Sequence, residues 1–156
     1  MKRLLIIILC FWVVNTRSQS TGQVKELNVY GENGKSVIGK VIVNATTTTK
    51  LFLLKSIQKK DTVNNYVTTF YFGNKETTPL LEARILMKFS KPVIDVMPSF
   101  SAAFNSVNGL SDDHLTYVFK AGRLERDPGS VVIISFTIKS KGRVVTEISG
   151  LDGIVR

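Results

Sequence analysis

The stretch LEARILMKF, residues 81–89, decides the fold class. Its odd positions are all apolar, whereas Glu82, Arg84 and Lys88 occupy even positions. With a period of two, the apolar side chains gather on one face of a strand, and only Leu86 falls on the other face. The composition also suits a helix, but at 100° per residue the apolar positions scatter around the axis. The stretch therefore predicts a half-buried β-strand.

The same alternation recurs along the chain. In residues 37–43 it places Val37, Gly39, Val41 and Val43 on the inward face. Further strands are expected where the pattern alternates or where β-branched and aromatic residues are concentrated. These are residues 24–30, 51–57, 66–72, 93–97, 115–121, 132–139 and 144–149.

Turn residues separate these runs. The sequence Gly31-Glu32-Asn33-Gly34 predicts a tight turn between the first two strands. Lys91-Pro92 predicts a bend at which the chain crosses between sheets, and residues 140–143 predict a hairpin turn. Residues 105–113, with Asn108-Gly109, are expected to form a loop. Eight or nine short strands predict an all-β fold, an antiparallel two-sheet sandwich, with a closed barrel as the alternative.

The N-terminus has the pattern of a signal peptide over residues 1–20. Lys2 and Arg3 precede an apolar run at residues 4–14, and a polar stretch with Ser18 and Ser20 follows. The run is too short for a membrane-spanning helix, which needs about 20 residues. We expect cleavage after Ser20, one domain over residues 21–156, and a secreted or periplasmic (cell-envelope) location. The alternative is an uncleaved anchor, with membrane attachment through residues 4–14.

Loss of the signal peptide would change the available chemistry. It removes Cys10 and Trp12, the single cysteine and the single tryptophan. It also removes three cations, so that the formal charge falls from +9 to +6. Without cysteine the domain has no disulfide framework, and packing alone must stabilise it. The spread of the positive charges is typical of a solvated surface, with an anionic partner such as an acidic polysaccharide or lipid surface as the functional alternative. For an exported chain, nucleic acid is not an expected partner.

Two segments carry a resemblance to a known class of domain. They are residues 71–93, with Tyr71-Phe72-Gly73-Asn74 and Phe89-Ser90-Lys91-Pro92, and residues 117–138, with Pro128-Gly129 before a long strand. This arrangement resembles bacterial Ig-like accessory domains of the cell-adhesion-related and cohesin-like kind, over about residues 63–149. The resemblance implies a non-catalytic module for binding or spacing, and it assigns no functional residue.

Residues with catalytic or metal-binding chemistry form no recognisable motif, so we expect a non-enzyme without cofactor or metal. His114 is the single histidine, and its neighbours Asp112 and Asp113 are too close in sequence to serve as the acid of a triad. A calcium site from Asp112 and Asp113 with Asn105 and Asn108 would not match an EF-hand loop. A small hydrolase that uses acidic residues is retained as an alternative.

Exposed aromatic residues are the remaining candidates for ligand binding. Tyr71 is expected on the face opposite Phe70 and Phe72, and Phe100 and Phe104 are expected on a loop of small residues. The leading hypothesis is an exported, non-catalytic Ig-like module that binds a cell-surface protein or polysaccharide. The alternatives beyond the hydrolase are a carbohydrate-binding module and a structural subunit that assembles through an edge strand.

Overall fold

The computed structural model describes residues 24–44, 51–62, 64–73, 80–100, 105–122, 132–150 and 153–155. These residues form eleven strands and no helix, so they contain no helical membrane span. The strands are β1 (Val24–Tyr30), β2 (Val37–Asn44), β3 (Phe52–Thr62), β4 (Asn65–Gly73), β5 (Leu80–Phe89), β6 (Asp95–Phe100), β7 (Asn105–Leu110), β8 (Thr116–Gly122), β9 (Ile133–Lys141), β10 (Thr146–Ser149) and β11 (Gly153–Val155).

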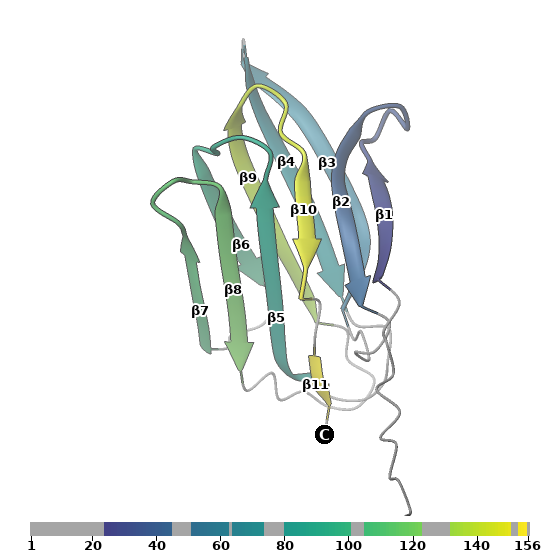
Figure 1. Ribbon diagram of the computed structural model, residues 1–156, viewed down its shortest axis with the longest axis vertical. Helices are drawn as coiled ribbons and strands as arrows, with labels where there is room; N and C mark the ends of the chain where they lie inside the picture. Colours follow the sequence, from purple (N-terminus) through teal and green to yellow (C-terminus); the bar gives the residue numbers. More distant parts are fainter. Residues whose placement is uncertain are drawn as a thin grey trace, which may run out of the picture.

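The strands form two sheets that face each other (Figure 1). The larger sheet has the order β1-β2-β10-β5-β8-β7, and β11 pairs with β5 next to the end of β10. The smaller sheet has the order β3-β4-β9-β6. All pairs are antiparallel except β2 with β10. The predicted all-β, two-sheet sandwich is therefore confirmed.

The chain changes sheets at both bends singled out in the sequence. At Lys91-Pro92 it passes from β5 in the larger sheet to β6 in the smaller one, as predicted. Residues 140–143 also join different sheets, β9 and β10, so the predicted hairpin turn is wrong. Gly142 has a φ of 73°, and its N–H donates to the carbonyl of Asn64 at 2.5 Å. This bond extends the β4–β9 pairing one step beyond Asn65 and Lys141, and only after it does the chain cross to β10 in the larger sheet.

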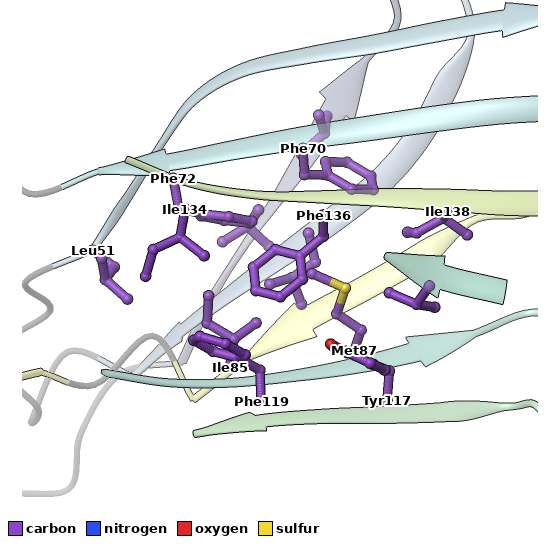
Figure 2. Packing of buried hydrophobic residues seen from close by; sticks show 14 of the residues in the cluster. Leu51, Phe70, Phe72, Ile85, Met87, Tyr117, Phe119, Ile134, Phe136 and Ile138 are labelled. Atoms are coloured by element: carbon purple, nitrogen blue, oxygen red, sulfur yellow. The ribbon is translucent and has the colours of Figure 1, made fainter. Parts of the chain in front are cut away.

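The core lies between the two sheets, with Phe136 of β9 at its centre (Figure 2). Its ring centroid lies 5.1 Å from that of Phe119, 5.8 Å from that of Tyr117 and 6.1 Å from that of Phe72. The rings meet edge to face, the arrangement that aromatic quadrupoles favour. From the deciding stretch, Ala83, Ile85, Met87 and Phe89 are all buried. The predicted inward face of β5 is thus confirmed at these four positions.

Strand β2 differs from prediction at its start. Val29 pairs with Gly39 and Tyr30 with Val37, so Ile38 is the extra residue of a β-bulge. Ile38 is 1% exposed and Val37 is 38% exposed, so the expected inward position of Val37 is wrong. After the bulge the expected alternation holds. At Gly39 a Cβ atom would lie 3.0 Å from the ring of Phe70, so the close approach of the two sheets requires glycine here.

Two of the strands were not predicted. Residues 105–110, expected as part of a loop because of Asn108-Gly109, form β7, and every position from Asn105 to Leu110 pairs with β8. Strand propensity depends strongly on context, and the neighbouring β8 satisfies the backbone of this polar segment. The other unpredicted strand is the three-residue β11. The predicted signal peptide, residues 1–20, lies outside the described residues.

Candidate functional site: an apolar groove at one edge of the sandwich

The β1 edge of the larger sheet and the β3 edge of the smaller sheet lie on the same side of the molecule (Figure 1). One hydrogen bond joins them, from Ser56 Oγ to the carbonyl oxygen of Tyr30 at 3.0 Å. Alongside this contact lies a groove of about 570 Å³. Its apolar lining comes from Leu27, Val29, Tyr30, Val41, Val43, Leu51, Phe52, Leu53 and Leu54. The size is that of a typical ligand site.

Strand β1 provides one wall of this groove, which we call the edge groove. Leu27 and Val29 both point to the inner face of the larger sheet, because they pair with Val41 and Gly39. Val29 is 6% exposed, but Leu27 is 44% exposed. The smaller sheet therefore covers only part of β1, and Leu27 is an inner-face residue without full cover.

Strand β3 provides the opposite wall. Leu53 pairs with Phe72 and Lys55 with Tyr71, which makes Leu54 the extra residue of a bulge. Leu54 is 45% exposed, and Tyr30 across the groove is 50% exposed. Tyr30 pairs with the outward-facing Val37, and Leu54 lies over Gly73 next to the inward-facing Phe72, so both line the rims of the groove. Leu27 is the exposed apolar side chain that faces its inside. A concave surface with a mostly apolar lining is the usual setting of a ligand site.

The charged residues of the edge groove are cations. Lys25 and Lys55 line it, and neither has an ion-pair partner among the described residues. The nearby Glu26 is already paired with Lys40, Nζ to Oε1 at 2.5 Å. The hydrogen bond and the charge of Glu26 raise the pKa of Lys40 above its usual value. The lining of the groove thus includes two lysines without an ion-pair partner among the described residues, and Lys55 lies at the rim in register with the outward-facing Tyr71.

The four edge strands differ in how well they can accept another strand. Pro98, in the middle of β6, has no N–H to donate. Strand β3 has two bulges and three lysines, both of which discourage strand pairing. Strand β7 contains Asn105, Asn108 and Gly109, which have low strand propensity. Strand β1 keeps a regular register with β2 from Val24 to Val29 and borders the edge groove. Of the four edges, β1 is the one best suited to strand addition.

Tyr71 and Phe100, the two predicted aromatic site residues that the structure describes, lie in different surroundings. Tyr71 lies half-buried on the outer face of the smaller sheet, in register with Lys55 and Ser135, and its ligand-binding role stays a prediction. Phe100 ends β6, and its ring centroid lies 5.6 Å from that of Phe119. It packs against the core, so its expected place on an exposed loop is wrong. Phe104 lies outside the described residues.

The polar residues around His114 hold a turn together. The Asp113 carboxylate accepts hydrogen bonds from Ser111 Oγ at 2.5 Å and from the N–H of Leu115 at 3.0 Å. These bonds lower the pKa of Asp113, the serine hydroxyl contributing most. His114 has a φ of 57°, and its Nδ1 lies 2.8 Å from the carbonyl oxygen of Val93. The described residues hold no group of three metal-ligating side chains. The turn connects β7 to β8, and the bonds between His114 and Val93 tie it to the β5–β6 connection, so these polar groups have structural roles.

Sequence reasoning did not find the edge groove, although one signal was available. Leu53 and Leu54 are adjacent apolar residues within a segment otherwise read as a strand, and such a pair breaks the period of two. A break of this kind indicates either a bulge or an apolar side chain on the outer face. Comparison of the chain with protein-family models, curated proteins and solved structures found no match.

Proposed function

We propose that the chain is an exported, non-catalytic binding module that takes up an extended segment of a partner polypeptide at the edge groove. The exposure of the inward-facing Leu27 in an apolar groove beside the edge of β1, with Tyr30 and Leu54 at the rims, carries the proposal. A strand added to β1 would gain backbone hydrogen bonds, and its alternate side chains would enter the groove. Recognition would combine the open backbone edge with apolar contacts.

The charge of the edge groove narrows the class of partner. Lys25 and Lys55 lack carboxylate partners in the described residues, so acidic residues at the ends of the incoming segment would complement them. A second copy of this chain would instead bring lysines to lysines, and the chain without residues 1–20 carries a formal charge of +6. We therefore infer a partner segment with apolar residues at alternate positions, flanked by carboxylates.

A peptide titration tests this proposal. The probe is the heptapeptide EVTLTVE, followed by chemical shifts of the β1 amide groups in ¹⁵N NMR spectra. We expect shifts between Lys25 and Val29, and weaker binding of the composition-matched peptide EVVLTTE, which lacks alternation. Leu27→Ser and Leu54→Ser should each weaken binding about tenfold, the effect of roughly 1.4 kcal/mol of lost apolar burial. Val107→Ser, on the exposed edge strand β7, is the matched control.

Three results would overturn the proposal. The first is equal binding of the two peptides, and the second is no binding of either. The third is concentration-dependent dimerisation that Leu27→Ser abolishes, measured by analytical ultracentrifugation, because it would assign the edge groove to a second copy. The contribution of the lysine charge to binding is tested separately. Lys25→Glu should weaken binding of EVTLTVE but not of the neutral peptide QVTLTVQ.

Export and the Ig-like class belong to the same proposal. The pattern of residues 1–20 supports export, and mass spectrometry of the secreted protein should find an N-terminus at Thr21. An N-terminus at Met1 on a membrane-bound product would instead support an anchor through residues 4–14. Two sheets with repeated crossing of the chain between them support an Ig-like class of sandwich.

A further inference from the structure

A second, polar pocket lies at the end of the sandwich that carries the β1–β2 turn. It has a volume of about 330 Å³ and is lined by Gly31, Glu32, Asn33, Ser36, Gln58, Lys60, Tyr66 and Arg143. The lining comes from four separate parts of the chain: the β1–β2 turn, β3, β4 and the β9–β10 connection. It shares no residue with the edge groove.

Two cations, Lys60 and Arg143, line this pocket. The Cζ atom of Arg143 lies over the ring of Tyr66, 5.9 Å from its centroid, and such cation–π contacts orient a guanidinium group. Lys60 pairs with Tyr66 in the β3–β4 ladder, which places it on the same face. Neither Lys60 nor Arg143 forms an ion pair with a described residue, although Glu32 also lines the pocket. An anionic group would therefore find an oriented planar fork and a second positive charge.

Neutral hydrogen-bonding groups accompany the cations. Asn33 Oδ1 accepts bonds from the N–H of Lys35 at 3.1 Å and from the N–H and Oγ of Ser36 at 3.2 and 3.0 Å. These bonds fix the Asn33 amide and occupy its oxygen, while its NH₂ group has no bond to a described residue. Gln58 donates through Nε2 to Thr68 Oγ1 at 3.0 Å, which leaves its Oε1 as an acceptor. The Asn33 NH₂ group is thus a fixed donor and Gln58 Oε1 a fixed acceptor, and a ligand hydroxyl group can bond to either.

We infer that this pocket binds a carboxylate-bearing sugar of an acidic polysaccharide. Arg143 and Lys60 would hold the carboxylate, and Asn33 and Gln58 would hold hydroxyl groups of the sugar. A simple inorganic anion has no array of hydroxyl groups to bond both amides while it holds the cations, so it would use fewer of these groups at once. The inference is independent of the proposed peptide groove.

Calorimetric titration of the purified protein with an alginate hexasaccharide tests the inference. We expect binding that maltohexaose, which is neutral, does not reproduce and that inorganic phosphate displaces only weakly. Arg143→Gln should lower the affinity at least about tenfold, and Arg143→Lys by less, because an ammonium group keeps the charge but loses the fork. Lys60→Gln, on another strand, provides a second variant, and thermal unfolding checks that each variant is folded.

Lys120→Gln is the matched control, because it removes the same charge from an exposed position on β8. We expect it to change the affinity by less than about twofold, since salt screens distant charges. Equal losses in Arg143→Gln and Lys120→Gln would overturn the inference and indicate non-specific charge attraction. Equal binding of maltohexaose, full displacement by millimolar phosphate, or no binding of the alginate hexasaccharide would overturn it as well. Leu27→Ser should leave this binding unchanged, which separates the pocket from the edge groove.

Discussion

Phe136 and Leu27 both point to the inside of the sandwich, but they occupy very different surroundings. Phe136 is fully buried among aromatic rings from both sheets (Figure 2). Leu27 sits on the edge strand of the larger sheet, where the smaller sheet covers it only in part, and it is 44% exposed. Inward orientation therefore does not mean burial, and the incomplete cover of one edge is what creates a candidate binding surface.

The largest expected loss of stability follows from a change at the centre of the core. Phe136→Ala removes the ring that contacts Phe72, Tyr117 and Phe119, so it should lower the free energy of unfolding by about 3–5 kcal/mol. Denaturant titration measures this loss. A loss below about 1 kcal/mol would show that the centre is as loosely packed as the edge, and the contrast between the two regions would fail.

The next effect concerns the close contact between the sheets. A Cβ atom at Gly39 would lie 3.0 Å from the Phe70 ring and 3.1 Å from the carbonyl oxygen of Thr146. Gly39→Val should therefore destabilise the fold by about 1–3 kcal/mol through overpacking. Gly109→Val, where no atom lies within 4 Å of the added Cβ, is the control and should cost much less.

The hydroxyl group of Tyr117, a residue of the core, is buried without a hydrogen-bond partner in the described residues. It allows the effect of burial on a polar group to be measured. Burial, followed by the charge of Asp95, raises the pKa of Tyr117 to about 12. The unfolded chain ionises first, near pH 10, so this group should lower stability between about pH 10 and pH 12, by up to about 3 kcal/mol. Tyr117→Phe should remove that part of the alkaline loss.

At neutral pH, Tyr117→Phe should raise the free energy of unfolding by about 1 kcal/mol, because it removes an unsatisfied buried group. Denaturant titrations of both proteins at pH 7 and pH 11 give the two differences. Lower stability of the variant at pH 7 would mean that the hydroxyl makes a stabilising bond, for example to a buried water molecule.

The smallest expected effect on stability is at the edge. Leu27→Ser should change the free energy of unfolding by no more than about 0.5–1 kcal/mol, since the side chain is already half exposed. The same variant is expected to weaken peptide binding about tenfold. At this position a large loss of affinity should therefore accompany a small loss of stability. A loss of stability as large as that of Phe136→Ala would identify Leu27 as a core residue and remove the reason to treat the groove as a site.

Much of the fold follows from period and turn chemistry. Alternation at Ile85 and Met87 identifies the inner face of β5, and Lys91-Pro92 marks a change of sheet. The predictions from sequence were wrong where the neighbouring strand decides the local structure of a segment. The bulge that turns Ile38 inward depends on register with β1, and β7 forms because β8 supplies its hydrogen bonds. The candidate sites were missed for a similar reason, since the edge groove combines residues of β1 and β3, which lie side by side only through sheet packing.

The sequence by itself determined that the described chain is built of strands, which side chains of the long strands face inward, and that the chain has a pattern typical of export. These properties depend on local periodicity and composition, which neighbouring residues define. The tertiary structure alone decided which strands became edges, how far one sheet covers the other, and how Arg143 comes to lie over Tyr66. Such contacts join residues far apart in the chain, so their geometry depends on the packing of the whole sandwich.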